Sequence, residues 1–486
     1  MQTNKIKTIG IIGAGVSGIG AARLLQQAGF ECELIERGEK VGGIWVDGYH
    51  SFGLQTPKSL YEISDYPIPD SFPRVPNGAE LQAYFENYAK DYDVYNKINF
   101  NTCVTKLEQQ TDKKWSIQTL NDKTGQASDK VYDFVVVATG LYFDPYIPEF
   151  PHKEKFKGQV LHTNDYKSPS VITHSKVVVV GFGKSALDVA GEAAKFSKEV
   201  HLVYRRTHWP IPLDIFNLLD VRRVFMSRFA NVFLLPYQHA GKWTKRLHQN
   251  FPWVISAFWK ISESIIKFQF PLKKCDLLPD EPMKTGVFNL GFVPRNEFYK
   301  LIENGTIKTH RTSIKSYTEK GLLLENGEEI ACDTIVFGTG YKPNTSFMPE
   351  AFNKSQEKDG VYLYRHIIHP DLSNMAFIGR AATFSNSLTS HIASAWLAEL
   401  LKGKFQLPKR KDMLANIDEM KQWKRSFMPD ISSRSTVVKL HMVHYLDELL
   451  KDMGINPWRK KNKLAEWFAD YRPSDYREVL SEVNEK

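Results

Sequence analysis

Two glycine-rich turns in the sequence have the spacing that cradles a dinucleotide pyrophosphate. The first holds Gly13, Gly15 and Gly18 as G-x-G-x-x-G, directly after an apolar run. In such a turn the first glycine permits the tight bend, the second lets a pyrophosphate approach the backbone, and the third lets a helix pack on the strand. Glu36 ends the next apolar run, 23 residues after Gly13 (36 − 13), where a carboxylate accepts hydrogen bonds from ribose hydroxyls. The first turn therefore predicts an adenine dinucleotide with a free ribose.

A second turn begins at Gly181 and differs from the first in two ways. Gly181 and Gly183 are followed by Ala186 in the third place, and the next apolar run ends in Arg205 and Arg206, the former 24 residues after Gly181 (205 − 181). Guanidinium groups suit a 2′-phosphate, which a carboxylate would repel. The second turn therefore predicts NADP. A solvated strand end is the alternative interpretation of the two arginines.

Two dinucleotides with no dithiol between them indicate direct hydride transfer. The four cysteines are far apart and form no C-x-x-C pair, which excludes a redox dithiol and a zinc knuckle and favours a reducing compartment. His366 and His369 have no third ligand at sensible spacing, so no metal site is predicted. We therefore expect NADPH to pass hydride to a tightly held flavin.

The elements that position these turns alternate between apolar runs and helical stretches, which predicts an α/β fold. Two apolar strands, within 132–145 and 332–344, each end in Thr-Gly and return the chain to the ligand edge of a parallel sheet. Those pairs are Thr139-Gly140 and Thr339-Gly340. We expect two Rossmann-like domains, the NADP-binding one inserted into the FAD-binding one. The expected boundaries are 1–168 and 331–455 for the FAD-binding domain, 169–330 for the NADP-binding domain with a basic helical insert at about 209–290, and 456–486 for a charged C-terminal extension.

The net charge of +9 is concentrated in one segment. Between Arg222 and Lys274 ten lysines and arginines stand against one acid, Glu263, and three tryptophans lie among them. No nucleic-acid-binding motif accompanies this charge, so no nucleic-acid partner is expected. We interpret the segment as a lid over the substrate entry that attracts anionic NADPH, because its apolar stretches are short and interrupted by Pro236 and Pro252. The alternative is weak contact of 222–274 with an anionic membrane surface.

We expect neither a signal peptide nor a membrane anchor in this sequence. The apolar run near the N-terminus is the first strand of the glycine motif rather than a signal peptide, and the last residues are too charged for an anchor. No stretch reaches about 18 uncharged apolar residues, so no membrane-spanning helix is expected. We expect a cytoplasmic protein that acts on a small molecule. The oligomeric state stays open.

Several further motifs resemble a known family. Phe156–Lys167 has the form F-x-G-x-x-x-H-x-x-x-Y and lies between the two glycine turns, which resembles the signature of the flavin-containing monooxygenases. Val41–Trp45, "VGGIW", is similar to the family's segment after the ribose-binding acid. The stretch "LQTPKSLYEISDYPIPDSFPRVP" resembles the family's active-site segment, particularly in plant-type members. The resemblance covers roughly residues 5–405 and involves six motifs in order.

The resemblance implies an activity of the N,N-dimethylaniline monooxygenase type. In this family NADPH reduces FAD, NADP⁺ stays bound, and O₂ adds to the flavin to give a C4a-hydroperoxyflavin. One oxygen atom then passes to a soft nucleophile of a small molecule, commonly an amine nitrogen or a sulfide sulfur. The protein excludes water and holds the nicotinamide over the flavin. Two alternatives are an NADPH oxidase that releases H₂O₂ and a flavoprotein redox sensor without turnover.

The resemblance also assigns residues to roles. Gln55 stands where many members carry an asparagine that helps hold the oxygenated flavin, and His162 and Tyr166 mark the linker between the domains; we take these three as catalytic candidates, with hinge hydrogen bonding as the alternative for the last two. The cofactor candidates form two groups. On the FAD side they are Gly13, Gly15, Gly18, Glu36, Gly43, Trp45, Gly140 and Thr339, and on the NADP side Gly181, Gly183, Ser185, Ala186, Arg205 and Arg206.

Overall fold

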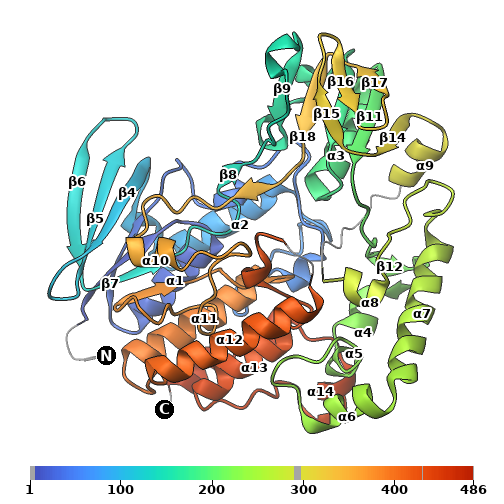
Figure 1. The fold of residues 1–486 in the computed structure, drawn as a ribbon. Coiled ribbons are helices and arrows are strands. Elements are labelled where there is room, and N and C mark those ends of the chain that lie inside the picture. The colour runs from blue at the N-terminus through green and yellow to red at the C-terminus, as the bar shows by residue number, and fades with distance from the viewer. Residues whose placement is uncertain (1–5, 289–296, 429–430, 485–486) are drawn as a thin grey trace.

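The computed structural model describes residues 6–288, 297–428 and 431–484. Its first parallel sheet has the strand order β20-β7-β1-β2-β3, with the N-terminal glycine turn after the central strand (Figure 1). β1, β7 and β20 are short, almost fully buried apolar runs, as expected for a parallel sheet covered on both faces. Their bounds are β1 Thr8–Ile12, β2 Glu31–Ile35, β3 Ile98–Asn99, β7 Phe134–Val137 and β20 Met375–Phe377.

The second parallel sheet repeats the plan around the second glycine turn, in the order β14-β11-β10-β18-β9. Its central strand carries four consecutive buried valines, a β-branched run that favours a strand buried on both faces. The strands are β9 Gln159–His162, β10 Lys176–Val180, β11 Glu199–Tyr204, β14 Ile307–Arg311 and β18 Thr334–Phe337. The expectation of two Rossmann-like domains is thereby confirmed.

The boundaries expected between the domains need correction at two strands. β9, expected in the first domain, pairs with β18 of the second sheet, with Gln159 opposite Thr334 and His162 opposite Phe337. β18 itself, expected after the boundary at 331, pairs with β10. The second sheet therefore extends from residue 159 to residue 337. Strand pairing between such distant segments is set by the whole sheet and leaves no local sign in the sequence.

Helices cover the first sheet and bring the C-terminal third of the chain back to it. α1 (Val16–Gln27) packs against α11 (Asn386–Leu401), where the Ser17 and Ser390 hydroxyls are 2.8 Å apart. α11 is buried along nearly its whole length, because α13 packs on its other side. The remaining helices of this part are α2 Gly78–Asp91, α10 Glu350–Lys354, α12 Arg410–Phe427, α13 Met442–Asp452 and α15 Val479–Asn484.

Helices and small antiparallel sheets complete the two domains. The sheet β4-β5-β6 stands beside the first parallel sheet, and the sheet β15-β16-β17 lies against the second (Figure 1). The helix α3 (Lys184–Phe196) follows the second glycine turn and packs on β10, β11 and α9 (Phe298–Glu303). The antiparallel strands are β4 Thr102–Gln109, β5 Trp115–Asn121, β6 Ala127–Tyr132, β15 Ile314–Tyr317, β16 Gly321–Leu324 and β17 Glu329–Ala331, with the short pairs β8 Asp144–Pro145 and β19 Tyr341–Lys342, and β21 Ala382–Thr383 and β22 Val437–Lys439.

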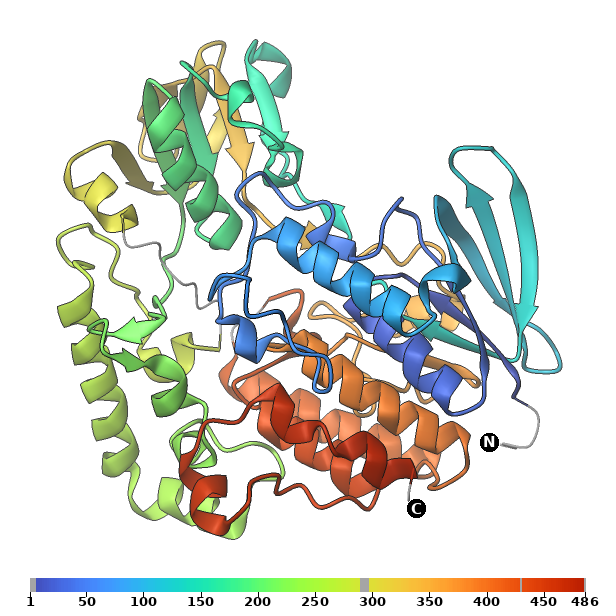
Figure 2. The same ribbon diagram turned by 180° about the vertical axis from the view of Figure 1, so that it is seen from behind.

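The basic insert forms a separate helical column between β11 and β14. In Figure 1 it occupies the right-hand edge of the molecule and in Figure 2 the left-hand edge, with the long helix α7 outermost. Arg228 at the start of α5 ties the column to α13 and α14 through ion pairs with Asp447 and Glu466. In the described part of the chain, no helix combines the length and apolar character needed to cross a bilayer. The elements are β12 Asp214–Ile215, β13 Leu219–Asp220, α4 Val221–Phe225, α5 Arg228–Asn231, α6 Lys242–Asn250, α7 Pro252–Gln269, α8 Met283–Gly286 and the packed α14 Lys463–Phe468.

Candidate active site

One continuous cavity of about 1400 Å³ joins the two glycine turns. It lies where the carboxyl ends of both parallel sheets meet, the position at which open α/β sheets bind ligands. The candidate residues in its wall are Gly13, Gly15, Glu36, Gly43, Trp45, Gln55, Gly140, Gly181, Gly183, Ser185, Arg205, Arg206 and Thr339. Gly18, Ala186, His162 and Tyr166 do not line it.

Two of the three glycines in the first turn are required by the protein structure itself, and the third is not. Gly13 has φ 104°, and a Cβ there would lie 2.7 Å from the Ala138 carbonyl, so the turn itself requires glycine. A Cβ at Gly18 would lie 1.8 Å from the Gly13 carbonyl, so this position serves packing of α1. Gly15 is different: its φ is −73°, and a Cβ would meet only Gly43, at 3.7 Å. The fold does not require glycine at position 15. A pyrophosphate can approach the backbone closely only if this position has no side chain.

The N-terminus of α1 is open to the cavity. Gly15 is its N-cap and supplies no side chain to satisfy the first free N–H groups. These groups and the partial positive charge of the helix end are suited to phosphate oxygens. The residues present therefore fit the pyrophosphate of FAD.

Glu36 has a structural contact in addition to its expected one. Its carboxylate is buried and accepts hydrogen bonds from the backbone N–H groups of Ala14 and Gly38, both at 2.7 Å. These bonds fix the glycine turn against the end of β2. Each oxygen has a further lone pair, and the residue lies in the cavity wall, so hydrogen bonding to ribose hydroxyls stays our prediction.

The second glycine turn has the same division of roles. Gly181 has φ 125°, and a Cβ there would lie 2.5 Å from the Gly338 carbonyl. Ala186 is fully buried under Gly338, where it packs α3 on the sheet and does not face the cavity. Gly183, the N-cap of α3, has open space around its Cβ position and no capping side chain. A second phosphate cradle therefore faces the first across the cavity.

Arg205 and Arg206 end β11 and extend into the cavity wall. Both residues are exposed, and in the part of the chain that the structure describes neither has an ion pair with an acid. A pair of guanidinium groups without an internal carboxylate partner suits an external phosphate. Binding of the 2′-phosphate by Arg205 and Arg206 stays our prediction.

Gln55 lies in the cavity wall, which also includes aromatic side chains from neighbouring segments of the chain. Trp45 is buried and stacks on Phe52, with ring centroids 4.9 Å apart, and meets Tyr61 edge-on at 5.4 Å. Burial raises the pKa of the Tyr61 hydroxyl, so this ring stays neutral. These aromatic side chains add apolar surface to the cavity wall, and apolar surface helps to exclude water from a reaction site.

His162 and Tyr166 lie in the linker, behind the cavity wall. The His162 Nδ1 accepts a hydrogen bond from the Asn164 N–H, so its Nε2 donates to the Gly340 carbonyl, each at 3.0 Å. Burial lowers the pKa of His162 and keeps the ring neutral. Tyr166 is fully buried, and its carbonyl accepts from the His50 N–H at 2.8 Å. Their contacts correspond to the hinge alternative, so we treat both as positioning residues.

The two Thr-Gly pairs end β7 and β18 on opposite sides of the cavity. Gly140 and Gly340 have φ 74° and 83°, with open space at their Cβ positions. The Thr339 hydroxyl donates a hydrogen bond to the Tyr146 carbonyl, which lies directly after β8. Both pairs therefore form backbone wall rather than reactive groups.

The sequence analysis did not predict a role for Lys184 or His208, which both lie in the cavity wall. Lys184 starts α3 and donates to the Tyr49 hydroxyl at 2.9 Å; that hydroxyl donates to Asp188 at 2.6 Å, and Lys184 also pairs with Asp188. This cluster joins α3 to the loop after Gly43. His208 also lines the cavity, and burial lowers its pKa to about 4, with Lys439 and Arg206 adding to the effect. Lys184 could have been found in the sequence, because it lies inside the turn "GFGKS". No feature of the sequence pointed to His208.

Comparison with known proteins decides the family. The model of the flavin-binding monooxygenase-like family matches residues 6–465. The chain belongs to this family. "Probable flavin-containing monooxygenase 1" of Arabidopsis thaliana is 31% identical, over 96% of each chain. "Dimethylaniline monooxygenase [N-oxide-forming] 2" of Oryctolagus cuniculus is 29% identical, over 93% of this chain and 83% of its own.

Solved structures share the family's fold. The S-allyl-L-cysteine S-oxygenase of Allium sativum superposes with a TM-score of 0.65 at 20% identity, over 99% of this chain and 94% of its own. OTEMO, solved as a complex with FAD and NADP, gives 0.64 at 18% identity, over 99% and 98%. The expectations of a flavin-containing monooxygenase, of a resemblance to plant members and of the FAD and NADPH pair are thereby confirmed for the family to which the chain belongs.

Proposed function

We propose that the protein oxygenates a soft nucleophile, an amine nitrogen or a sulfide sulfur, of a small molecule. The observation that supports the proposal is one continuous cavity whose lining includes both glycine turns and Gln55. Bound there, NADPH supplies the hydride, and the reduced flavin with O₂ supplies the oxygen atom. The protein therefore needs no covalent catalyst of its own.

The residues of the chain bind, orient and exclude water. The N-termini of α1 and α3 hold the two pyrophosphates, and Arg205 and Arg206 hold the 2′-phosphate. Aromatic and aliphatic side chains of the wall reduce the water near the reacting centre. These side chains include Trp45, Phe52, Phe182, Phe384 and Ile431.

The names of the relatives support transfer to nitrogen or sulfur. One is N-oxide-forming and one is an S-oxygenase. We also propose a cytoplasmic location, because all four cysteines are free thiols in the structure. An NADPH oxidase is the second candidate, because a glutamine replaces the asparagine typical of the family at position 55.

The test measures where the electrons of NADPH go. The purified protein is mixed with NADPH and ¹⁸O₂, using N,N-dimethylaniline and methyl p-tolyl sulfide as probes, and both labelled product and H₂O₂ are quantified. We expect labelled N-oxide or sulfoxide in proportion to NADPH consumed. Flavin reduction with all electrons recovered as H₂O₂ would support the oxidase. Absence of flavin reduction by NADPH would support the sensor.

A further inference from the structure

Residues 46–52 form a loop whose two ends belong to the first domain. The loop begins after Trp45, which is buried in the core of that domain. At its other end the Phe52 carbonyl accepts a hydrogen bond of 2.9 Å from the N–H of Gly78, the first residue of α2. Trp45 and Phe52 also stack on each other. Both ends of the loop are therefore attached to the domain that carries the first cradle.

The middle of this loop packs on the second domain. Tyr49 is only 5% exposed, and its ring lies in the hydrophobic core that also contains residues of β10, β11 and α3. Lys167, in the linker after β9, donates hydrogen bonds to the carbonyls of Asp47 and Gly48 at 2.7 and 3.1 Å. A side chain of the first domain thus completes the core of the second, and a change in the angle between the domains has to move these contacts.

One side of α3 receives the loop. Lys184, Asp188 and Glu192 follow one another at intervals of four residues, so they lie on the same side of this helix. The Tyr49 hydroxyl donates a hydrogen bond to Asp188 at 2.6 Å and accepts one from Lys184 at 2.9 Å, and Lys184 pairs with Asp188. One turn further along, the His50 Nδ1 lies 2.7 Å from the Glu192 carboxylate. Two consecutive side chains of the loop are therefore attached to two consecutive turns of α3.

The charges of this contact compensate each other. The side chains of Asp188 and Lys184 are 9% and 19% exposed, and a buried charge that loses its partner is strongly destabilising. Asp188 also lies close to Gly183, the N-cap of the second cradle, where an uncompensated carboxylate would repel the phosphates of the cofactor. The hydroxyl of Tyr49 is neutral and connects the charged pair to the loop. Removing this hydroxyl alone therefore releases the loop and leaves the ion pair intact.

Both partners of the contact face the cofactor cavity. Tyr49 and Phe52 of the loop line it, and so do Gly183 and Lys184 at the start of α3. The loop continues directly to Gln55, which is also in the wall. Hydride transfer needs the two reacting rings in a narrow range of distances, and a misplacement of about 1 Å can cost about 100-fold in rate. A contact that fixes the first domain on the helix of the second cradle therefore bears on this alignment.

We propose that the Tyr49 cluster, made of Tyr49, Lys184 and Asp188, positions the two cofactor cradles for hydride transfer. The inference rests on the proposed function, in which NADPH reduces the bound flavin. The three residues act through the angle between the domains rather than on the reacting atoms, so they are positioning residues. Because a cofactor on the N-terminus of α3 contacts the same helix that holds Tyr49, NADP also restrains the loop of the first domain through this cluster.

The experiment combines flavin reduction with hydrogen exchange in the FAD-loaded full chain. Anaerobic stopped-flow over a series of NADPH concentrations separates the limiting rate of reduction from the Kd of NADPH. In Tyr49→Phe the limiting rate should fall at least about tenfold, while the Kd changes by less than about threefold, because the cradle and the arginines are intact. A Lys184→Met/Asp188→Leu variant, which removes both charges together, should show the same fall in limiting rate, and its combination with Tyr49→Phe should be no slower than either.

Hydrogen exchange gives a readout that does not depend on turnover. In the wild type, saturating NADP⁺ should slow the exchange of backbone amides in residues 46–56. Tyr49→Phe should lose most of this slowing, although NADP⁺ still occupies the cavity beside the loop. Loss of overall stability would instead raise exchange throughout the chain.

Tyr66→Phe is the matched control. The Tyr66 hydroxyl also donates to an aspartate, Asp91 at the end of α2, but both residues belong to the first domain and neither lines the cavity. This variant should keep the wild-type limiting rate and the slowing by NADP⁺. A wild-type limiting rate in Tyr49→Phe, or equal slowing of exchange in Tyr49→Phe and the wild type, would overturn the proposal. Failure of NADPH to reduce the wild type would refute the proposed function, and the exchange measurement would still decide on the Tyr49 cluster.

Discussion

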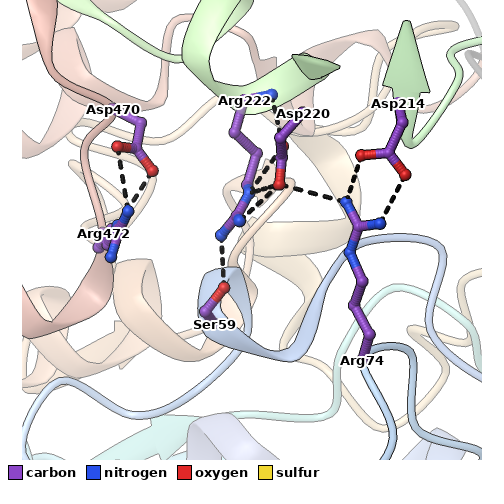
Figure 3. Close-up of polar contacts among 7 residues, drawn as sticks. All are labelled: Ser59, Arg74, Asp214, Asp220, Arg222, Asp470 and Arg472. Carbon is purple, nitrogen blue, oxygen red and sulfur yellow. Dashed lines mark hydrogen bonds and ion pairs between the residues drawn. The ribbon is translucent and has the colours of Figure 1, made fainter. Parts of the chain in front are cut away.

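Asp214 and Asp220 stand directly opposite each other across the hairpin β12–β13, and arginines from both sides hold the pair together. Arg74 binds Asp214 through two hydrogen bonds of 2.5 and 2.8 Å and also reaches Asp220 at 3.2 Å, while Arg222 binds Asp220 (Figure 3). Two carboxylates in a directly opposed pair repel unless cations compensate them. Arg74 therefore attaches the insert to the segment that carries Gln55.

Replacing Arg74 should loosen this attachment. Arg74→Gln removes the two-bond contact and leaves Asp214 beside Asp220, with an expected loss of about 1 kcal/mol, since the arginine is half exposed. Limited proteolysis should cut the hairpin faster, and Arg74→Gln/Asp214→Asn should restore part of the protection. Arg410→Gln, which breaks an exposed ion pair with Asp371, is the control. Equal protease sensitivity of Arg74→Gln and the wild type would contradict the role.

The glycine turns could be predicted because their chemistry is local. The turn, the start of the helix and the residue that ends the next strand fall within about 25 residues of one another. Gly15, Glu36 and Arg205 were therefore all expected at the ligand site, and all three line the cavity. The α/β class follows from the same alternation of strand and helix. Strand pairing between remote segments has no such local sign, and the domain boundaries at β9 and β18 were misplaced for that reason.

Contacts between remote residues account for the other differences. Lys184 meets Tyr49 across 135 positions of the chain, and no spacing rule predicts that pair. His162 and Tyr166 belong to a motif that marks the linker, but the motif alone does not tell a catalytic residue from one that orients two domains. Ala186 occupies the third place of the second glycine motif, where it packs under Gly338. This third place contacts the sheet and not the ligand.

Gly15→Val should abolish flavin binding. The backbone at Gly15 has an ordinary φ and room for a Cβ, so the protein should fold, whereas the larger side chain fills the space that the pyrophosphate needs. Purified Gly15→Val should be colourless, with a far-UV spectrum like that of the wild type. Gly20→Ala, in the same helix with open space around its Cβ, should stay yellow. Full flavin occupancy in folded Gly15→Val would refute the assignment of the first cradle.

Arg205→Ala and Arg206→Ala should abolish the preference of the enzyme for NADPH over NADH. A hydrogen bond to a charged group contributes about 1.5–3 kcal/mol, so kcat/KM for NADPH should fall at least about tenfold. The value for NADH should change little, because NADH has no 2′-phosphate. Lys195→Ala removes an exposed cation of α3 outside the cavity wall and should affect neither cofactor. An equal loss with both cofactors would show that the arginines have another role.

The ion pair between His239 and Glu448 should make stability depend on pH near neutrality. The His239 Nδ1–H group donates a hydrogen bond of 2.5 Å to the Glu448 carboxylate, and this bond raises the pKa of His239 above its ordinary value. The contribution is therefore fully present below about pH 6.5 and is lost as the pH rises through the folded pKa. The Tm should fall by about 1–2 °C between pH 6.5 and 8, and His239→Gln should remove that part of the decrease. His152→Gln, on the surface, should retain it; an unchanged pH profile in His239→Gln would exclude the pair as the cause.

Gln55 should govern how much of the reduced flavin's oxygen reaches substrate. Gln55 lines the cavity, so we expect its amide to hydrogen-bond to polar groups that form there after O₂ enters. Hydride transfer depends mainly on stacking of the nicotinamide, so Gln55→Ala should reduce its flavin with NADPH at nearly the wild-type rate. An unmade hydrogen bond in a dry site costs about 1–3 kcal/mol, so the ratio of H₂O₂ release to oxygen transfer should rise by about one to two decades. Gln55→Asn should keep or improve coupling if the position of the amide is what matters. Stopped-flow reduction and peroxide yield per NADPH measure the two stages separately, and unchanged peroxide yield in Gln55→Ala would place the amide away from the reacting flavin.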